Sequence, residues 1–319
     1  MKKKISVVVP MYNEEAGIVE FLGQQLLPVL GKLEYDTEIV LVDDGSRDKT
    51  VEKVVEKYGS SKGEKIKIIA LARNFGKEIA LTAGLNHATG DAVIMIDADG
   101  QHPVEMIPKM VKKWDSGAEI VTAVRDENTT KHKLGSKIYY AMMKICGNKK
   151  IVVGAMDYRL LDRSVVDEFN KMTERNRLTR GLVDWLGYPQ EYIKVHTNSR
   201  MNGKPTYSHK KLIALTMDGL ASTSRTPLMI FGYIGVFITA VSLLLGLFIL
   251  IQQYILGDPL HLDWSGAVAM SVFISFLVGL VLISQAITAL YISQIHTEAK
   301  GRPLYIINKR KSIGVDNEE

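Results

Sequence analysis

The sequence predicts an α/β domain with a mostly parallel sheet, followed by two membrane-spanning helices. Short apolar stretches alternate with helical patterns through the first 125 residues, and most of these stretches run into charged side chains. The last hundred residues contain two long blocks without charge. Alternation of strand and helix at this pitch is typical of a parallel sheet with helices on both faces.

The expected strands cover residues 5–10, 38–42, 65–71, 93–96, 118–124 and 191–197. Apolar residues recur at helical spacing in 18–30, 46–58, 78–88, from 104 onward and, after a polar loop at 126–133, in 134–145. The loops that follow parallel strands lie on one edge of the sheet, which is where α/β proteins bind ligands. Functional side chains are therefore expected in these loops.

The strand that ends at Ile96 runs directly into Asp97, Asp99 and Gln101. An unbroken apolar run of this kind indicates a strand buried on both faces, and such a strand has no reason to end in two acids unless something positive meets them. Carboxylate and amide oxygens suit a hard divalent cation, which commonly bridges nucleotide phosphates. A solvated acidic turn is the alternative, but the position after a buried strand favours a metal–phosphate site.

Other polar side chains follow the neighbouring strands. They are Tyr12, Glu14, Asp43, Asp44, Arg73, Lys77 and Arg125. No Gly-x-Gly-x-x-Gly motif follows any strand and no P-loop motif is present, which disfavours a dinucleotide-binding fold and excludes a P-loop NTPase. A nucleotide would therefore be held by side chains and a metal ion.

Two later positions also carry possible chemistry. Asp157 lies between apolar runs, which indicates a partly buried carboxylate, with a turn or helix-cap aspartate as the alternative. The loop at 198–207 contains Arg200, Gly203 and Lys204, a composition that suits an anion. On composition alone, a solvated basic loop without a ligand is an equally good interpretation.

The uncharged blocks at 227–256 and 264–295 each exceed the ~20 residues that span a bilayer. Residues 208–224 form an amphipathic pattern, typical of a helix in the membrane surface or of a core helix. The short connection between the blocks has acids but no Lys or Arg, whereas basic residues flank their other ends. By the positive-inside rule, we expect the α/β domain and both termini to be cytoplasmic.

The domain organisation that follows is 1–205 for the α/β domain, 206–225 for the juxtamembrane helix, 226–296 for the membrane hairpin and 297–319 for a cytoplasmic tail. The net charge of +5 is too small to indicate nucleic-acid binding. A single cysteine, Cys146, excludes an intrachain disulfide and fits a reducing compartment.

Five motifs carry a resemblance to a known family. They are Val-Pro-Met-Tyr-Asn-Glu-Glu at 9–15, Asp-Asp-Gly-Ser-Arg-Asp-Lys-Thr at 43–50, Arg-Asn-Phe-Gly-Lys at 73–77, Asp-Ala-Asp-Gly-Gln-His-Pro at 97–103 and Tyr-Arg-Leu-Leu-Asp-Arg at 158–163. With these motifs the chain resembles the family 2 glycosyltransferases of the GT-A fold. Within them it is most similar to polyprenyl-phosphate glycosyltransferases, such as bactoprenol glucosyltransferases and dolichyl-phosphate mannose synthases.

Two positions depart from the family pattern. Gly100 replaces the usual Leu of the Asp-x-Asp motif. The late Arg-x-x-Gly-x-Ser-Lys motif keeps Arg200 and Gly203, but Pro205 and Thr206 stand in place of Ser-Lys. The resemblance implies that Lys204 replaces the lost charge.

The resemblance implies a role for each site residue. Base and ribose of a nucleotide sugar would be held by Pro10, Tyr12, Glu14, Asp44 and Ala98. Mg²⁺ or Mn²⁺ would be ligated by Asp97, Asp99 and Gln101, with Asp97 also beside the ribose. Arg125 would stabilise the leaving diphosphate, Asp157 takes the family's catalytic-base position, and Arg200 and Lys204 would hold the acceptor phosphate.

The expected activity is inverting, metal-dependent transfer of a sugar, with glucose expected, from a UDP-sugar to undecaprenyl phosphate for cell-envelope glycosylation. Transfer from GDP-mannose or another UDP-sugar is the alternative within the same class. A processive polysaccharide synthase lacks support because its Gln-x-x-Arg-Trp motif is missing. A non-catalytic nucleotide-sugar sensor is disfavoured by the intact Asp-x-Asp motif. The resemblance also admits a homotetramer, the assembly of relatives with two spans.

Overall fold

The computed structural model describes residues 2–59, 66–125, 152, 154–175, 177–196 and 295–314, with isolated residues between 251 and 292. The chain forms two compact units. One comprises Met1–Tyr140, Lys149–Leu212 and Arg302–Glu319, and the other comprises Ala141–Asn148 and Ile213–Gly301. The first unit holds the sheet and the predicted site residues that the structure describes.

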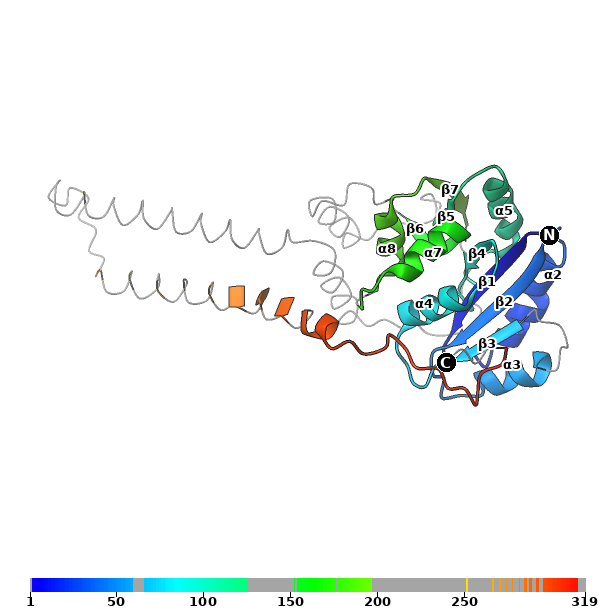
Figure 1. Ribbon diagram of the computed structural model, residues 1–319, viewed down its shortest axis with the longest axis horizontal. Coiled ribbons are helices and arrows are strands. Elements are labelled where there is room, and N and C mark those ends of the chain that lie inside the picture. Colours follow the sequence, from blue (N-terminus) through cyan, green and yellow to red (C-terminus); the bar gives the residue numbers. More distant parts are fainter. Residues whose placement is uncertain are drawn as a thin grey trace. The chain divides into compact units, whose positions relative to one another are not determined.

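The first unit is built on a seven-stranded sheet with the order β3-β2-β1-β4-β6-β5-β7 (Figure 1). The strands are β1 Lys4–Met11, β2 Asp36–Asp43, β3 Ile66–Ala70, β4 Ala92–Met95, β5 Ile120–Arg125, β6 Ala155–Asp162 and β7 Gln190–Val195. Neighbouring strands are parallel except at β6, which is antiparallel to both β4 and β5. The prediction of a mostly parallel sheet is therefore confirmed, whereas β6 was not predicted as a strand.

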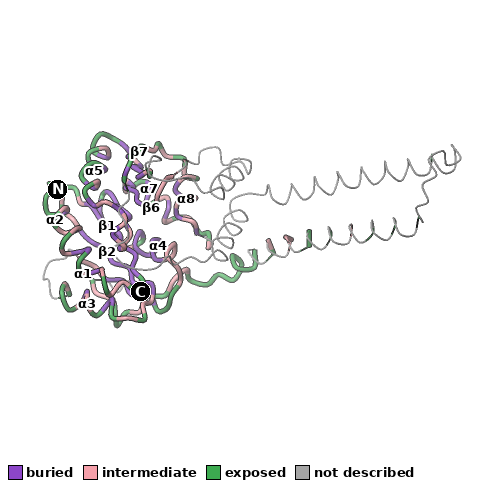
Figure 2. Tube along the Cα trace, turned by 180° about the vertical axis from the view of Figure 1, so that it is seen from behind, coloured by how far each residue is buried: buried purple, intermediate pink, exposed green. Residues whose placement is uncertain are grey.

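Helices cover both faces of the sheet. One face packs against α1 Ile18–Glu20, η1 Phe21–Leu26, α2 Leu27–Leu30, α3 Thr50–Tyr58, η2 Val104–Met106 and α5 Ile107–Asp115. The other face packs against α4 Lys77–His87, α7 Arg163–Lys171 and α8 Thr179–Leu186. Successive residues of β1, such as Val7 and Val8, therefore enter different cores. This explains the unbroken apolar runs of the central strands, which are buried along most of their length in Figure 2.

One expected helix starts later than its apolar pattern suggested. The pattern indicated a helix from residue 46, but α3 begins at Thr50. The carboxylate of Asp43 accepts the Ser46 N–H, and that of Asp48 accepts both the N–H and the hydroxyl of Thr50. These side-chain bonds hold residues 46–49 in a turn, because aspartate competes with the helix for backbone N–H groups.

The antiparallel direction of β6 determines where Asp157 lies. The ladder between β4 and β6 pairs Ala92 with Asp162 and Met95 with Arg159. Continuing this register two residues beyond the ladder sets Asp97 opposite Asp157. Because β6 runs against β4, its first residues lie at the edge where β4 ends. The sheet thus places Asp157 on the edge that carries the Asp-x-Asp motif.

The chain returns to the sheet near its C-terminus. Residues 305–313, here called the edge segment, run antiparallel beside β3, with bridges from Ile307 to Leu71 and from Ile313 to Ile68. The Asn308 N–H donates to the Ala70 carbonyl at 2.7 Å. Figure 1 shows this last part of the chain, in red, beside β3. The edge segment therefore supplies hydrogen-bond partners to a strand that would otherwise end the sheet.

No helix among the described residues is long and apolar enough to cross a membrane. The predicted spans at 227–256 and 264–295 lie largely outside the described residues. The predicted helices at 134–145 and 208–224, together with Arg200 and Lys204, lie wholly outside them.

Candidate active site

The predicted donor-site residues lie on one edge of the sheet, where parallel strands end. Pro10 is in β1, Tyr12 and Glu14 follow that strand, Asp44 follows β2, Asp97, Ala98, Asp99 and Gln101 follow β4, and Arg125 is the last residue of β5. The loop after β1 is joined to the loop after β2, since the Glu14 N–H donates to the Thr50 hydroxyl at 2.8 Å and the Asn13 N–H to the Ser46 hydroxyl at 2.9 Å. The topology thus brings these residues to a common rim.

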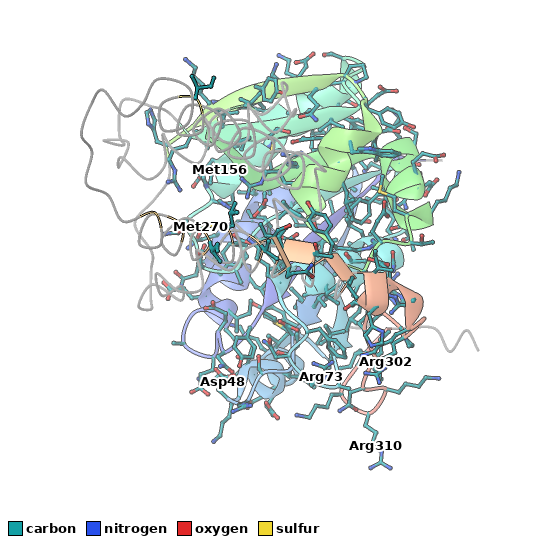
Figure 3. The ribbon with its side chains drawn as sticks, turned by 90° about the vertical axis from the view of Figure 1, so that its left-hand side faces the viewer. Asp48, Arg73, Met156, Met270, Arg302 and Arg310 are labelled. Atoms are coloured by element: carbon teal, nitrogen blue, oxygen red, sulfur yellow. The ribbon has the colours of Figure 1, made fainter. Side chains whose placement is uncertain are left out.

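Asp44 organises the loop that precedes α4. Its buried carboxylate accepts the N–H of Phe75 at 2.7 Å and that of Gly76 at 2.9 Å. Burial raises the pKa of Asp44 above its ordinary value, although the two N–H bonds act in the opposite direction. Arg73, labelled in Figure 3, stacks over the Phe75 ring at 4.1 Å. The structure therefore gives Asp44 a part in fixing this loop, while its predicted contact with the ribose remains a prediction.

The same loop delivers Lys77 to two of the predicted site carboxylates. Lys77 is the first residue of α4, and its Nζ lies 2.7 Å from Asp97 Oδ1 and 2.8 Å from Asp97 Oδ2. The Nζ also lies 3.4 Å from Asp157 Oδ2. One ammonium group therefore joins the Asp-x-Asp motif to the predicted catalytic-base position.

A second cation contacts Asp157 from another helix. The Nε of Arg180, in the first turn of α8, lies 3.3 Å from Asp157 Oδ1. The starts of α8 and α4 are tied together, because Glu78 accepts the Thr179 N–H at 2.8 Å. Asp97, Lys77, Asp157 and Arg180 form an alternating series of charges, which we call the charge chain.

The charge chain sets the ionisation of its members. Burial by itself would raise the pKa of Asp157, but the nearby Lys77, Arg180 and Arg159 outweigh it and hold this pKa below its ordinary value. Burial would lower the pKa of Lys77, but Asp97 and Asp157 raise it above its ordinary value. At neutral pH Asp157 is thus an anion with low proton affinity and Lys77 is a cation. Such an aspartate suits orienting or charge-stabilising work better than proton abstraction.

His102 fixes the loop that carries Asp97. The His102 Nδ1 accepts the Asp97 N–H at 3.2 Å, and its ring stacks on Tyr158 with centroids 5.2 Å apart. Burial lowers the pKa of His102, so the imidazole is neutral at pH 7 and its proton is on Nε2. This nitrogen lies 3.9 Å from Asp97 Oδ2. His102 therefore holds the backbone of Asp97, whereas Lys77 holds its side chain.

An ion pair between the buried Arg159 and the partly buried Asp184 lies close to Asp157 in the sequence and the fold. Arg159, two residues further along β6, is 1% exposed, and its Nη1 lies 2.9 Å from Asp184 Oδ1 on α8. The same carboxylate oxygen accepts a bond from Gln190 Nε2 at 2.9 Å. The pair joins β6 to α8, the two elements that supply Asp157 and Arg180.

The residues of the Asp-x-Asp loop fit a hard divalent cation. Two carboxylates and an amide oxygen provide the ligand type that Mg²⁺ and Mn²⁺ prefer. Asp97 already faces a positive group, and the Gln101 N–H donates to Asp99 Oδ1 at 3.0 Å, which keeps the loop compact. Gly100 between them has a φ of 70°, a conformation that favours glycine. Among the described residues, no group of three or more His, Cys, Asp or Glu side chains is arranged to hold a metal ion, so any cation here would need further ligands from the donor or water.

Sequence reasoning missed several residues of this site. Lys77 was expected on the polar rim but was given no role, and its position after the third strand was the available signal. Arg180 lies on a helix that was not predicted, and Glu78 and His102 were taken as parts of a helix and a motif. No local pattern marks Arg180, because its partner Asp157 is reached only through the fold.

The fold of the first unit has a counterpart among solved structures. A solved structure with the same fold is mannosyl-3-phosphoglycerate synthase from Rubrobacter xylanophilus, with a TM-score of 0.51 and 15% identity, covering 68% of this chain and 72% of that chain. The family model described as "Glycosyl transferase family 2" matches residues 6–169. This chain belongs to glycosyl transferase family 2.

Several similar proteins match over nearly their whole length. A bactoprenol glucosyl transferase of Shigella phage SfX is 36% identical, covering 97% of this chain and all of the relative (100%). A prophage bactoprenol glucosyl transferase homolog of Escherichia coli K12 is also 36% identical, and the match covers 97% of this chain and 99% of the relative. An uncharacterized glycosyltransferase of Synechocystis is 38% identical, and the match covers 97% of this chain and 96% of the relative.

Proposed function

We propose that this glycosyltransferase moves glucose from UDP-glucose to undecaprenyl phosphate. The names of the full-length relatives support glucosyl transfer to a polyprenyl acceptor. The observation that carries the proposal is the position of Asp157, an ionised carboxylate held opposite Asp97 by two cations. A donor bound at the Asp-x-Asp loop would present its sugar to this carboxylate.

On the donor side, base and ribose are assigned to the rim residues Pro10, Tyr12, Glu14, Asp44 and Ala98. Asp97, Asp99 and Gln101 would hold Mg²⁺ or Mn²⁺. The bound ion supplies positive charge where the leaving diphosphate gains negative charge. Arg125, exposed at the end of β5, is assigned to the same diphosphate.

On the acceptor side, little proton abstraction is required. The second pKa of a phosphate monoester is about 6, so the lipid phosphate is largely dianionic at neutral pH. A phosphate oxygen forms a bond to the anomeric carbon as the bond from that carbon to the diphosphate breaks, which releases UDP and inverts the centre. Asp157 would orient the acceptor or stabilise the positive charge at the anomeric carbon. Arg200 and Lys204 are proposed to hold the lipid phosphate.

The decisive experiment incubates the purified full chain with undecaprenyl phosphate and one nucleotide sugar at a time. UDP-glucose, UDP-GlcNAc and GDP-mannose form the panel, and mass spectrometry of the lipid identifies the product. The expected product is undecaprenyl phosphate carrying one hexose from UDP-glucose, formed by the wild type and not by Asp157→Asn. A product from GDP-mannose or UDP-GlcNAc alone would replace the proposed donor, and no product from any donor would refute the lipid acceptor.

The proposal includes a membrane location with two spans, cytoplasmic termini and a homotetrameric assembly. A Cys146→Ser protein carrying His261→Cys, in the connection between the predicted spans, tests the topology. A membrane-impermeant thiol reagent should label it in intact cells, whereas labelling only after lysis would contradict the outward-facing hairpin. The mass of the detergent-purified protein, measured by light scattering, tests the assembly.

A further inference from the structure

We propose that Lys77 is a resident counter-ion that keeps a divalent cation off Asp97 until a nucleotide is present, so that metal binding depends on the nucleotide. The inference rests on the proposed function, because it concerns the cation and donor of that same site. It assigns Lys77 a positioning and gating role that the family match does not provide.

Lys77 already occupies the Asp97 carboxylate. The Lys77 ammonium lies 2.7 Å and 2.8 Å from the two oxygens of Asp97, so it engages both of them. A hard divalent cation binds carboxylate oxygen at about 2 Å. An ammonium group and a dication that share the same oxygens would repel each other strongly at this separation, since both are positive. Cation binding at Asp97 therefore requires Lys77 to move.

The charges of the charge chain balance before any cation binds. Asp97 and Asp157 carry two negative charges, and Lys77 and Arg180 carry two positive ones, so the charge chain is formally neutral. A neutral group offers a dication little net attraction, and Asp99 adds only one further carboxylate. A nucleotide diphosphate would bring the missing negative charge. Binding of the cation and binding of the nucleotide thereby become coupled, and such coupling is reciprocal.

Lys77 has a second partner that can retain it. Its Nζ already lies 3.4 Å from Asp157 Oδ2, and α4 begins at this residue after the loop held by Asp44. The ammonium can thus leave Asp97 through side-chain rotation and stay paired with Asp157 or with donor oxygens. The backbone anchor and the second carboxylate make Lys77 a displaceable group within a fixed site.

The test measures Mn²⁺ binding to the full-length protein in detergent by electron paramagnetic resonance, with and without UDP. Wild type should bind Mn²⁺ weakly alone and tightly with UDP. Lys77→Met should bind Mn²⁺ alone about tenfold more tightly than wild type, within the ~5–150-fold range of typical coupling between sites. Lys77→Arg, which keeps the charge, should behave like wild type, and Lys109→Met, an exposed lysine on α5, serves as the matched control.

The inference is overturned if Lys77→Met binds Mn²⁺ in the absence of nucleotide no more tightly than wild type does. It is also overturned if wild type binds Mn²⁺ equally tightly with and without UDP. Lys77→Gln carries the same test if Lys77→Met does not fold. The two proposals fail separately. A wild type that makes the lipid-linked sugar while Lys77→Met gains no affinity refutes the role of Lys77 alone. A wild type that makes no product refutes the proposed transfer, and the Mn²⁺ titration still decides the role of Lys77.

Discussion

Asp97 and Asp157 lie opposite each other in the continued register of β4 and β6, and the ammonium of Lys77 contacts both carboxylates. The two acids come from strands that run in opposite directions and are 60 residues apart in the printed sequence. Their proximity places the proposed donor-binding loop beside the proposed acceptor-side carboxylate. Changes to this pair should therefore separate donor binding from transfer.

Replacement of Asp157 by Asn should abolish most of the transfer and spare donor binding. The substitution removes a negative charge that faces Lys77 and Arg180 without changing side-chain size. The turnover number should fall about 10²-fold or more, within the range expected for a positioned catalytic group. The UDP affinity, measured by calorimetry, should change little. Asp167→Asn, an exposed aspartate on α7, is the control, and equal losses in both variants would contradict a catalytic role for Asp157.

Replacement of Asp99 by Ala should abolish transfer together with metal-dependent UDP binding. The side chain provides one of the two carboxylates of the proposed cation site, and one carboxylate with an amide is a poor set for Mg²⁺ or Mn²⁺. Titration of UDP in the presence of Mn²⁺ or of EDTA measures the effect. Asp36→Ala, an exposed aspartate at the start of β2, should retain the full response to Mn²⁺. Retained transfer in Asp99→Ala would argue against the cation site.

Replacement of Asp184 by Asn should lower the free energy of unfolding more than the loss of an exposed ion pair does. It leaves the Arg159 guanidinium, 1% exposed, without its carboxylate. Breaking a buried pair from one side costs about 3–5 kcal/mol. Thermal unfolding followed by circular dichroism provides the measurement. Glu168→Gln disrupts the exposed pair with Lys171 and should cost no more than about 1 kcal/mol. Similar losses of stability in the two variants would show that the Arg159–Asp184 pair contributes no more than an exposed pair.

The buried Glu38 carboxylate should make the stability fall in acid. It accepts bonds from the Ser6 hydroxyl at 2.5 Å and the Thr89 N–H at 2.6 Å, and it pairs with Lys4 at 2.8 Å. Burial would raise the pKa of Glu38, but these partners lower it from 4.5 to about 2. A depressed folded-state pKa gives stability that is present above pH 4.5 and is lost as the pH falls toward 2.

The full loss for Glu38 is about 3 kcal/mol, which follows from the difference between the two pKa values. Thermal unfolding at pH 7 and at pH 3 should show a smaller pH response in Glu38→Gln than in wild type. Glu56→Gln, an exposed glutamate on α3, should keep the wild-type response. If Glu38→Gln lost as much stability between pH 7 and pH 3 as wild type, the acid sensitivity would not come from Glu38.

The central strands and the position of the Asp-x-Asp motif at the sheet edge were predictable because their signals are local. The apolar run before Asp97 indicated a strand buried on both faces, and β4 lies between β1 and β6 with helices on each side. The polar residues after β1, β2 and β4 were expected on one edge, and the parallel order confirms it. The limits of individual elements were less certain, as the late start of α3 at Thr50 shows.

The contacts around Asp157 were not predictable from local pattern. The sequence of β6 mixes charged and apolar residues, so it has neither the unbroken run nor the alternation of a simple strand. Its antiparallel placement between β4 and β5 depends on the rest of the sheet. Lys77 and Arg180 converge on Asp157 only after α4 and α8 have packed on that sheet. Sequence patterns report local periodicity, whereas this convergence is a property of tertiary structure.

The edge segment has a practical consequence for anyone who isolates the sugar-transferring domain. Residues 305–313 follow the second unit in the sequence and pair with β3, and Figure 3 shows Arg310 extending outward from this part of the chain. A protein truncated at residue 205 would leave the backbone groups of Ile68 and Ala70 without these partners and would invite self-association through the bare strand. A soluble version of the domain should instead graft residues 302–314 back by a short flexible linker.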